Sequence, residues 1–136
     1  MSKLLGEEMG REYWRRDKLP SVALRFSNIM EEHDYADFPR YWEDARTRSW
    51  NLWGYVDARD VAQSCRLALT AEISGAEHYG ITAADTVMQR PSDELMAEVF
   101  PTVPHTSVEG TSTLVDISKA RRDLGYEPAH SWRDHV

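Results

Sequence analysis

Hydrophobic residues near the N-terminus recur with helical spacing. Residues 2–17 carry an apolar side chain at every fourth position, namely Leu5, Met9 and Tyr13, which is typical of one face of an amphipathic helix. After a proline, residues 21–28 (SVALRFSN) show little polar alternation, and this pattern favours an interior strand of a parallel sheet. A helix leading into such a strand is half of a βαβ unit, so the pattern predicts an α/β fold.

The same helix carries a second line of residues, Ser2, Gly6, Gly10 and Trp14. Each glycine inside a helix costs about 1 kcal/mol relative to alanine. We therefore expect another backbone or a ligand to approach the helix along this face.

The segment 29–53 is aromatic, charged and poorly periodic. This composition predicts a long loop with one short helix at 41–48. Loops of that length in a compact protein often carry function.

The second half of the chain alternates strand and helix patterns. We expect strands at 55–57, 77–83 and 113–117, and helices at 58–71, from Ser92 to Phe100, and from Asp116 or Ser118 to Gly125. Ser92 is expected to cap its helix. Val61, Cys65, Ala68 and Leu69 are expected to form the inward face of the helix 58–71, which makes Cys65 a small buried hydrophobe without chemistry.

Composition narrows the function classes. The 136 residues suffice for one domain with a core. Asp and Glu outnumber Lys and Arg by 23 to 16, and the basic residues are scattered, so nucleic acid is not an expected partner. With a single cysteine, no secretion signal and no membrane-spanning apolar run, the expected location is the cytoplasm.

The sequence lacks the motifs that are typical of metal sites, serine nucleophiles and dinucleotide-binding sites. The five histidines include no pair at helical metal spacing and only one cysteine accompanies them, so no metal site is expected. Neither a Gly-x-Ser-x-Gly elbow nor a glycine-rich nucleotide-binding turn occurs. This sequence alone therefore cannot assemble a complete dinucleotide site.

Four ordered segments carry a family resemblance: SKLLGEE (2–8), LRFSN (24–28), GYVDARDVA (54–62) and DISKARRDLGYEP (116–128). Together the chain resembles the C-terminal part of the NAD-dependent epimerase/dehydratases, which are extended short-chain dehydrogenases. The resemblance implies a Rossmann-like α/β fold. Residues 1–28 would be the last helix and strand of the NAD(P)-binding domain, and 29–136 would be mainly the small substrate-binding subdomain.

The resemblance also implies a catalytic lysine. Lys3 matches the lysine of the family's Tyr-x-x-Ser-Lys motif, while the tyrosine would fall just upstream of Met1. Lys3 would hold the nicotinamide ribose of NAD or NADP and lower the pKa of the tyrosine. Without that tyrosine and the glycine-rich turn, the chain alone is expected to be inactive.

Further site residues follow from the same resemblance. Phe26 would contact the cofactor and Asn28 the substrate, although Phe26 in the core and Asn28 in a simple turn remain alternatives. Asp57 and Asp60 are assigned helix-capping roles. Asn51 stands where many sugar-nucleotide members have an arginine, which weakens the case for a nucleoside-diphosphate sugar. Arg48 or Arg90 is a candidate replacement, with Arg90 assigned to substrate binding.

Two functions from different classes remain open. The first is the C-terminal part of an NAD(P)-dependent sugar or sugar-nucleotide epimerase/dehydratase, with a sugar-like substrate and a homodimeric full-length protein. The second is a truncated, non-catalytic paralogue that acts as a binding or subunit-interaction module.

Overall fold

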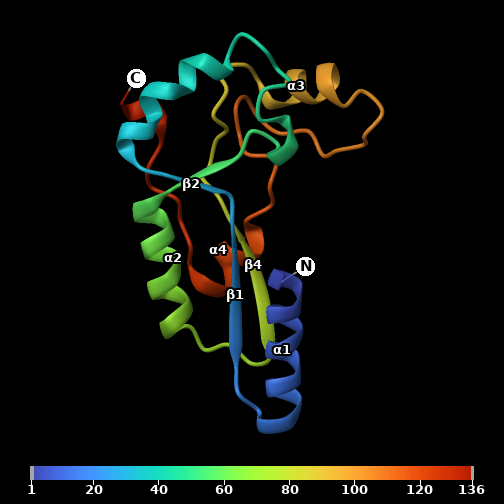
Figure 1. Cartoon of the computed structure of the whole chain (residues 1–136), viewed down its shortest axis with the longest axis vertical. Helices are drawn as coiled ribbons and strands as arrows, with labels where there is room; N and C mark the ends of the chain where they lie inside the picture. The colour runs from blue at the N-terminus through green and yellow to red at the C-terminus, as the bar shows by residue number, and fades with distance from the viewer. Residues whose placement is uncertain (1, 136) are drawn as a thin grey trace.

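The computed structural model describes residues 2–135 and has a mixed α/β architecture (Figure 1). Its helices are α1 (Ser2–Asp17), α2 (Ala58–Thr70), α3 (Ser92–Val99) and α4 (Ser118–Leu124), with 3₁₀ helices at Glu32–Tyr41, Ser49–Asn51 and Trp132–Asp134. Its strands are β1 (Ser21–Phe26), β2 (Asn28–Met30), β3 (Tyr55–Asp57) and β4 (Ala76–Ile81). The helix at 2–17 and the strand at 55–57 are confirmed as predicted.

Two small parallel sheets organise the chain. β1 pairs with β4 from Ser21↔Ala76 to Phe26↔Ile81, and β2 pairs with β3 from Asn28↔Tyr55 onward. Parallel strands need a crossover connection, and α2 lies within the one that joins β1 to β4. Figure 1 shows α1 alongside β1 and β4, with the long connections gathered beyond the strands' carboxyl ends.

The division at residue 28 stays a prediction, and one topological fact bears on it. β4 comes from the second segment, yet it pairs with β1 of the first. Part of the C-terminal segment therefore completes the first sheet.

The strand predicted at 21–28 is interrupted at Ser27. The Ser27 N–H donates to the Ile81 carbonyl at 3.0 Å, which is the last bond toward β4. From Asn28 onward the backbone pairs with β3 instead. The chain thus changes sheets at one residue, which the hydrophobic pattern alone does not reveal.

The helix predicted at 41–48 is wrong, because the helical segment lies earlier, at Glu32–Tyr41. A 3₁₀ helix has three residues per turn, so Tyr35 and Phe38 fall on one side, and both are buried. The residues from Trp42 to Arg48 form turns.

Two further expectations are corrected. The strand predicted at 113–117 does not form within the described residues, where only an isolated bridge joins Asp85 and Ser112. The Thr113 hydroxyl accepts the Val115 N–H at 3.2 Å, and this local bond competes with a ladder. Ser92 does not cap α3, because its hydroxyl donates to the Ser112 carbonyl at 2.6 Å.

The inward face of α2 is only partly the predicted one, because Val61 packs against a core cluster but Cys65 and Leu69 do not face inward. Asp60 and Ser64 are its buried residues, whereas Cys65 is exposed and Leu69 is 88% exposed. The Asp60 carboxylate accepts backbone N–H groups of Ala129 and His130. The C-terminal segment therefore decides which side of α2 is covered.

Two hydrophobic clusters form the core. One joins the 3₁₀ helix at Glu32–Tyr41, α3 and the C-terminal Trp132, and is centred on Trp53 and Tyr55. The other lies between β3, β4 and α4, and includes Tyr79 and Ile81. α4 ends as predicted at Gly125, whose φ of 70° is left-handed, a conformation that favours glycine.

Candidate functional site

Polar residues meet beyond the carboxyl ends of β1 and β4. Ser27 follows β1 and Thr82 follows β4, and both lie next to Gly54. A Cβ atom at Gly54 would lie 2.8 Å from Ser27 Oγ and 3.2 Å from the Asn51 carbonyl oxygen. The absence of a side chain at Gly54 therefore lets the loop 48–54 close over this edge of the sheet.

That loop has an unusual backbone. Arg48, Leu52 and Trp53 have φ values of 61°, 54° and 56°, in the left-handed region that L-residues rarely adopt. Trp53 is fully buried, and its Nε1 donates to the Ala45 carbonyl at 2.8 Å. Strain of this kind persists only where surrounding contacts impose it, and it is concentrated at functional sites.

The loop brings together the only two asparagines of the chain, Asn28 and Asn51. Asn51 Nδ2 donates to Asn28 Oδ1 at 3.3 Å and to the Gly54 carbonyl at 2.9 Å. Arg48 lies beside them, with an Nη2 contact of 3.4 Å to the same carbonyl and its guanidinium over the Tyr41 ring. We call Asn28, Arg48 and Asn51 the amide cluster.

The amide cluster has unused hydrogen-bonding capacity. Asn51 Oδ1 and Arg48 Nε are both buried and have no partner among residues 2–135. Buried polar atoms normally find a partner. Asn51 Oδ1 can therefore accept one further hydrogen bond and Arg48 Nε can donate one, although neither atom reaches the surface in this conformation.

A cavity of about 800 Å³ lies next to this loop. Its walls include Leu52 from the loop, Ala84 after β4, Met96 of α3, Val108, Leu114 and Ile117. We call it the distal cavity. Leu52 follows Asn51 directly, so the amide cluster and the distal cavity share one loop.

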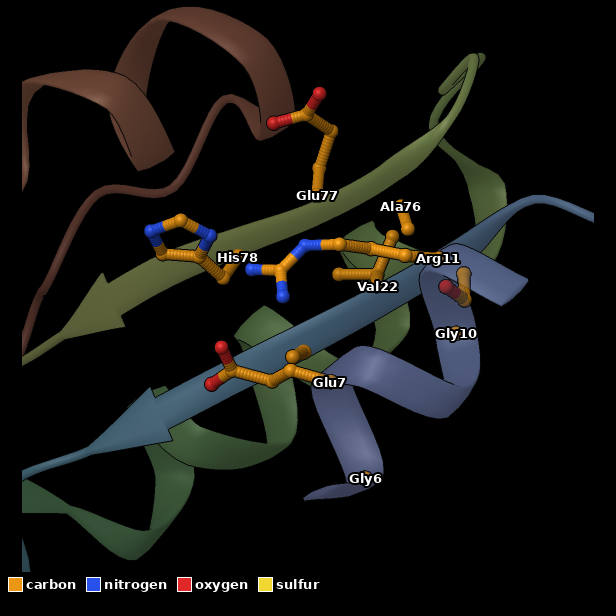
Figure 2. A pocket seen from close by; sticks show the side chains of 10 residues that line it. Gly6, Glu7, Gly10, Arg11, Val22, Ala76, Glu77 and His78 are labelled. Atoms are coloured by element: carbon orange, nitrogen blue, oxygen red, sulfur yellow. The ribbon is translucent and has the colours of Figure 1, made fainter. Parts of the chain in front are cut away.

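A second, much smaller cavity of about 80 Å³ lies between α1 and the β1–β4 sheet (Figure 2). At Gly10 the close neighbour is a side chain rather than the predicted backbone or ligand, because a Cβ there would clash with Ser21 Oγ. At Gly6 no atom of the described residues lies within 4 Å of an added Cβ, so the backbone approach expected there is not found. Glu7 beside this cavity is bound by Arg25 of β1 through two bonds of 2.7 and 2.8 Å.

The residues assigned from the sequence occupy three different places. Lys3 is exposed in the first turn of α1. Phe26 ends β1 and is 37% exposed, and Asn28 follows two residues later. Arg90 precedes α3, and its Nη2 lies 2.7 Å from Glu98 Oε2. The structure joins Asn28 to Asn51, whereas the roles of Lys3, Phe26 and Arg90 stay predictions.

Asp57 and Asp60 accept hydrogen bonds that fix the position of α2 next to the site. Asp57 is the N-cap of α2, as predicted, and accepts bonds from Arg59 and the Tyr35 hydroxyl. Burial alone raises the pKa of Asp57, but these bonds outweigh burial and hold the pKa well below its usual range. Asp60 accepts bonds from the C-terminal segment, including His130 Nδ1 at 2.8 Å.

The sequence pattern did not indicate a site role for Asn51, which was noted only because it stands where many sugar-nucleotide members have an arginine. Its partnership with Asn28 depends on the left-handed backbone around Leu52. No periodicity or motif encodes that conformation, because glycine is the usual signal for it and leucine stands there.

Comparison with solved structures identifies the fold. The chain is similar to the UDP-N-acetylglucosamine 4-epimerase from Bacillus cereus, with 22% identity and a TM-score of 0.58, over 96% of this chain and 45% of that one. It is also similar to RMD from Pseudomonas aeruginosa, whose structure contains NADPH, with 13% identity and a TM-score of 0.58, over 98% of this chain and 50% of that one.

The chain thus spans about half the length of these two proteins. No protein-family profile and no curated protein sequence matches it. No helix among residues 2–135 is both long and apolar enough to cross a membrane. At these identities the likeness establishes a shared fold: the chain has the α/β architecture of one half of an enzyme such as the UDP-N-acetylglucosamine 4-epimerase.

Proposed function

We propose that this chain is the substrate-binding half of an NAD(P)-dependent oxidoreductase that transfers a hydride at a carbonyl or alcohol of a sugar-like compound. The observation that carries the proposal is the amide cluster beyond the carboxyl end of β1, with its buried unpartnered acceptor and donor. The fold shared with an epimerase and an NADPH-bound protein supports the same class of chemistry.

The position of the cluster supports a ligand site. In parallel α/β sheets, ligands bind in the crevice outside the carboxyl ends of the strands. Asn28 stands at such an end, and Asn51 reaches it from the connection to β3. The amide cluster would bind and orient substrate hydroxyls, because a hydroxyl group can both donate to an amide oxygen and accept from an N–H donor.

Lys3 is the proposed cofactor contact. The two bonds between Glu7 and Arg25 tie α1 to β1, and Lys3 lies one helical turn before Glu7, toward the carboxyl end of β1. Lys3 would hold the ribose of the nicotinamide and favour the phenolate of a catalytic tyrosine from the rest of the protein. Phe26 would offer an apolar surface beside the nicotinamide.

The remaining cofactor contacts must come from elsewhere. NAD or NADP supplies the hydride acceptor or donor when bound. This sequence has no glycine-rich turn for its pyrophosphate. The chain alone is therefore expected to bind substrate but to show no NAD(P)-dependent turnover.

Side-chain amide signals test the proposal directly. The chain has only four carboxamide side chains, Asn28, Asn51, Gln63 and Gln89, so an ¹⁵N spectrum resolves each one. Addition of methyl α-D-galactopyranoside or its gluco isomer should shift the two asparagine signals and leave the glutamines unchanged, because Gln63 is bound to Glu127 and Gln89 is exposed. The variant Asn28→Ala should lose the response.

Unshifted asparagine signals with both sugars would contradict the proposal. A second test joins the chain to an N-terminal half that supplies the tyrosine and the glycine-rich turn. There, Lys3→Ala should lower kcat by about 10²-fold or more, as expected when acid–base catalysis is impaired. Lys3→Arg should restore activity only partly, because a planar guanidinium does not reproduce a compact ammonium.

An interaction module is the second candidate function. It is favoured by the apolar face of α1, where Leu5, Met9 and Tyr13 are 61%, 57% and 42% exposed. β1 also has a partner strand on only one side among the described residues. Faces of this kind mark sites of association.

A further inference from the structure

We infer that the distal cavity binds the non-reacting part of the substrate, and that this part is an uncharged aryl or alkyl group rather than a nucleoside diphosphate. The inference rests on the proposed function, since it concerns what is attached to the sugar-like group at the amide cluster.

The walls of the distal cavity are largely apolar. Leu52, Met96, Val103, Val108, Leu114 and Ile117 all line it. Its volume of about 800 Å³ lies within the usual range of about 300–1,000 Å³ for small-molecule sites. Burial against such walls favours an apolar ligand group by removing its surface from water.

The single guanidinium that lines the cavity already has an acidic partner, and the one lining histidine also lies beside a carboxylate. Arg121 Nε lies 3.2 Å from Glu127 Oε2. His105 Nε2 lies 3.4 Å from Asp93 Oδ1. The Ser107 hydroxyl holds the pKa of Asp93 below its usual range, so Asp93 remains a carboxylate. Within the described residues, the lining therefore offers a diphosphate no arginine or lysine without an acidic partner.

One part of the cavity wall carries a negative charge, which would repel a diphosphate. Asp116 lines the cavity, and the Ser118 N–H donates to its Oδ1 at 2.8 Å. This backbone bond lowers the pKa of Asp116, so the carboxylate is ionised at neutral pH. A diphosphate entering the cavity would be repelled by this charge, and a like-charge contact discriminates against the wrong ligand.

The amide cluster and the distal cavity are joined by two consecutive residues of the same loop. Asn51 binds Asn28, and the next residue, Leu52, lines the distal cavity. Consecutive Cα atoms are about 3.8 Å apart, which is less than the width of a sugar ring. A ligand of the inferred kind would place hydroxyl groups at the amide cluster and reach past Leu52 with an apolar substituent into the distal cavity.

Three galactosides with the same anomeric linkage test the inference. They are methyl α-D-galactopyranoside, 4-nitrophenyl α-D-galactopyranoside and UDP-α-D-galactose, with the corresponding glucosides as a second series. Affinity for the 136-residue chain is measured by following the Asn28 and Asn51 side-chain signals. The nitrophenyl compound should bind at least about tenfold more tightly than the methyl compound, as expected for burial of an aromatic ring. The UDP compound should show no such gain.

Substitutions inside and outside the cavity lining test whether the distal cavity causes the tighter binding of the nitrophenyl glycoside. Ala84 lines the cavity and is exposed, so Ala84→Phe should fill the space without disturbing the core. It should remove the nitrophenyl advantage and leave methyl glycoside binding unchanged. The control Ala97→Phe alters an exposed position of α3 outside the lining and should change neither. Val103→Asp, at a 49% exposed lining position, should weaken nitrophenyl binding by the same logic.

The outcomes separate the two proposals. If the asparagine signals respond but UDP-α-D-galactose binds most tightly, the inference is wrong and the proposed function stands. If the nitrophenyl advantage is absent, or survives both Ala84→Phe and Val103→Asp, the inference is also overturned. If no glycoside shifts either asparagine signal, the proposed function fails and the inference fails with it.

Discussion

The Asn51 side chain donates a 3.3 Å hydrogen bond to the side-chain oxygen of Asn28, across 23 positions of sequence. Asn28 begins β2, whereas Asn51 ends a 3₁₀ helix within a strained loop. The bond therefore joins the end of the first sheet to the connection that covers it.

Replacing Asn51 with Asp should destabilise the fold. The change keeps the shape but removes the amide that donates to Asn28 and to the Gly54 carbonyl. It also places a carboxylate beside two oxygen acceptors. We expect a loss of about 1–3 kcal/mol in the free energy of unfolding, measured by urea denaturation. The control Gln89→Glu makes the same chemical change at an exposed site and should alter stability by less than about 0.5 kcal/mol.

Alanine at two glycines should have opposite effects. At Gly54 the added Cβ would meet Ser27 Oγ and the Asn51 carbonyl, so Gly54→Ala should lower the melting temperature. At Gly6 nothing lies within 4 Å of the added Cβ, so Gly6→Ala should stabilise α1 by about 0.5–1 kcal/mol. Equal melting temperatures for both variants would contradict the close packing at Gly54. Adding Ser27→Ala to Gly54→Ala should recover part of the loss.

Acid should weaken the fold through Asp57. Because its pKa is lowered in the folded state, the carboxylate contributes stability that is fully present above its unfolded pKa, which is about 3.9. That contribution is lost as the pH falls below this value toward the folded pKa. Unfolding by urea at a series of pH values should therefore show a steep loss below about pH 4.

Asp57→Asn isolates this contribution. The variant should be less stable at pH 7 by about 1–3 kcal/mol, because Arg59 and the Tyr35 hydroxyl lose a charged acceptor. Its stability should also fall less steeply below pH 4. Asp37→Asn, at an exposed ion pair with Arg40, should keep the wild-type profile. An unchanged acid limb in Asp57→Asn would show that Asp57 does not control it.

The exposed face of α1 should cause self-association. Leu5, Met9 and Tyr13 present one apolar stripe flanked by charged residues. Sedimentation velocity should detect a concentration-dependent increase in mass that Met9→Glu reduces. Leu69→Glu introduces the same charge at an exposed leucine of α2 and should have less effect. A strictly monomeric wild-type chain at all concentrations would refute the expectation.

Local patterns sufficed for elements that depend on neighbouring residues alone. The helix Ser2–Asp17 follows from its periodicity, and the end of α4 at Gly125 follows from the left-handed conformation that glycine accepts. The cap of α2 by Asp57 is likewise local, because its carboxylate accepts an N–H two residues away. The α/β class was predictable for the same reason.

Tertiary contacts decided the rest. Which face of α2 is covered depends on the C-terminal residues that donate to Asp60, and their distance in sequence hides them from a helical pattern. The amide cluster forms because packing of Trp53 holds Arg48, Leu52 and Trp53 in left-handed conformations that their own side chains disfavour. Sequence alone determined the local elements, whereas long-range packing supplied the free energy that places Asn51 beside Asn28.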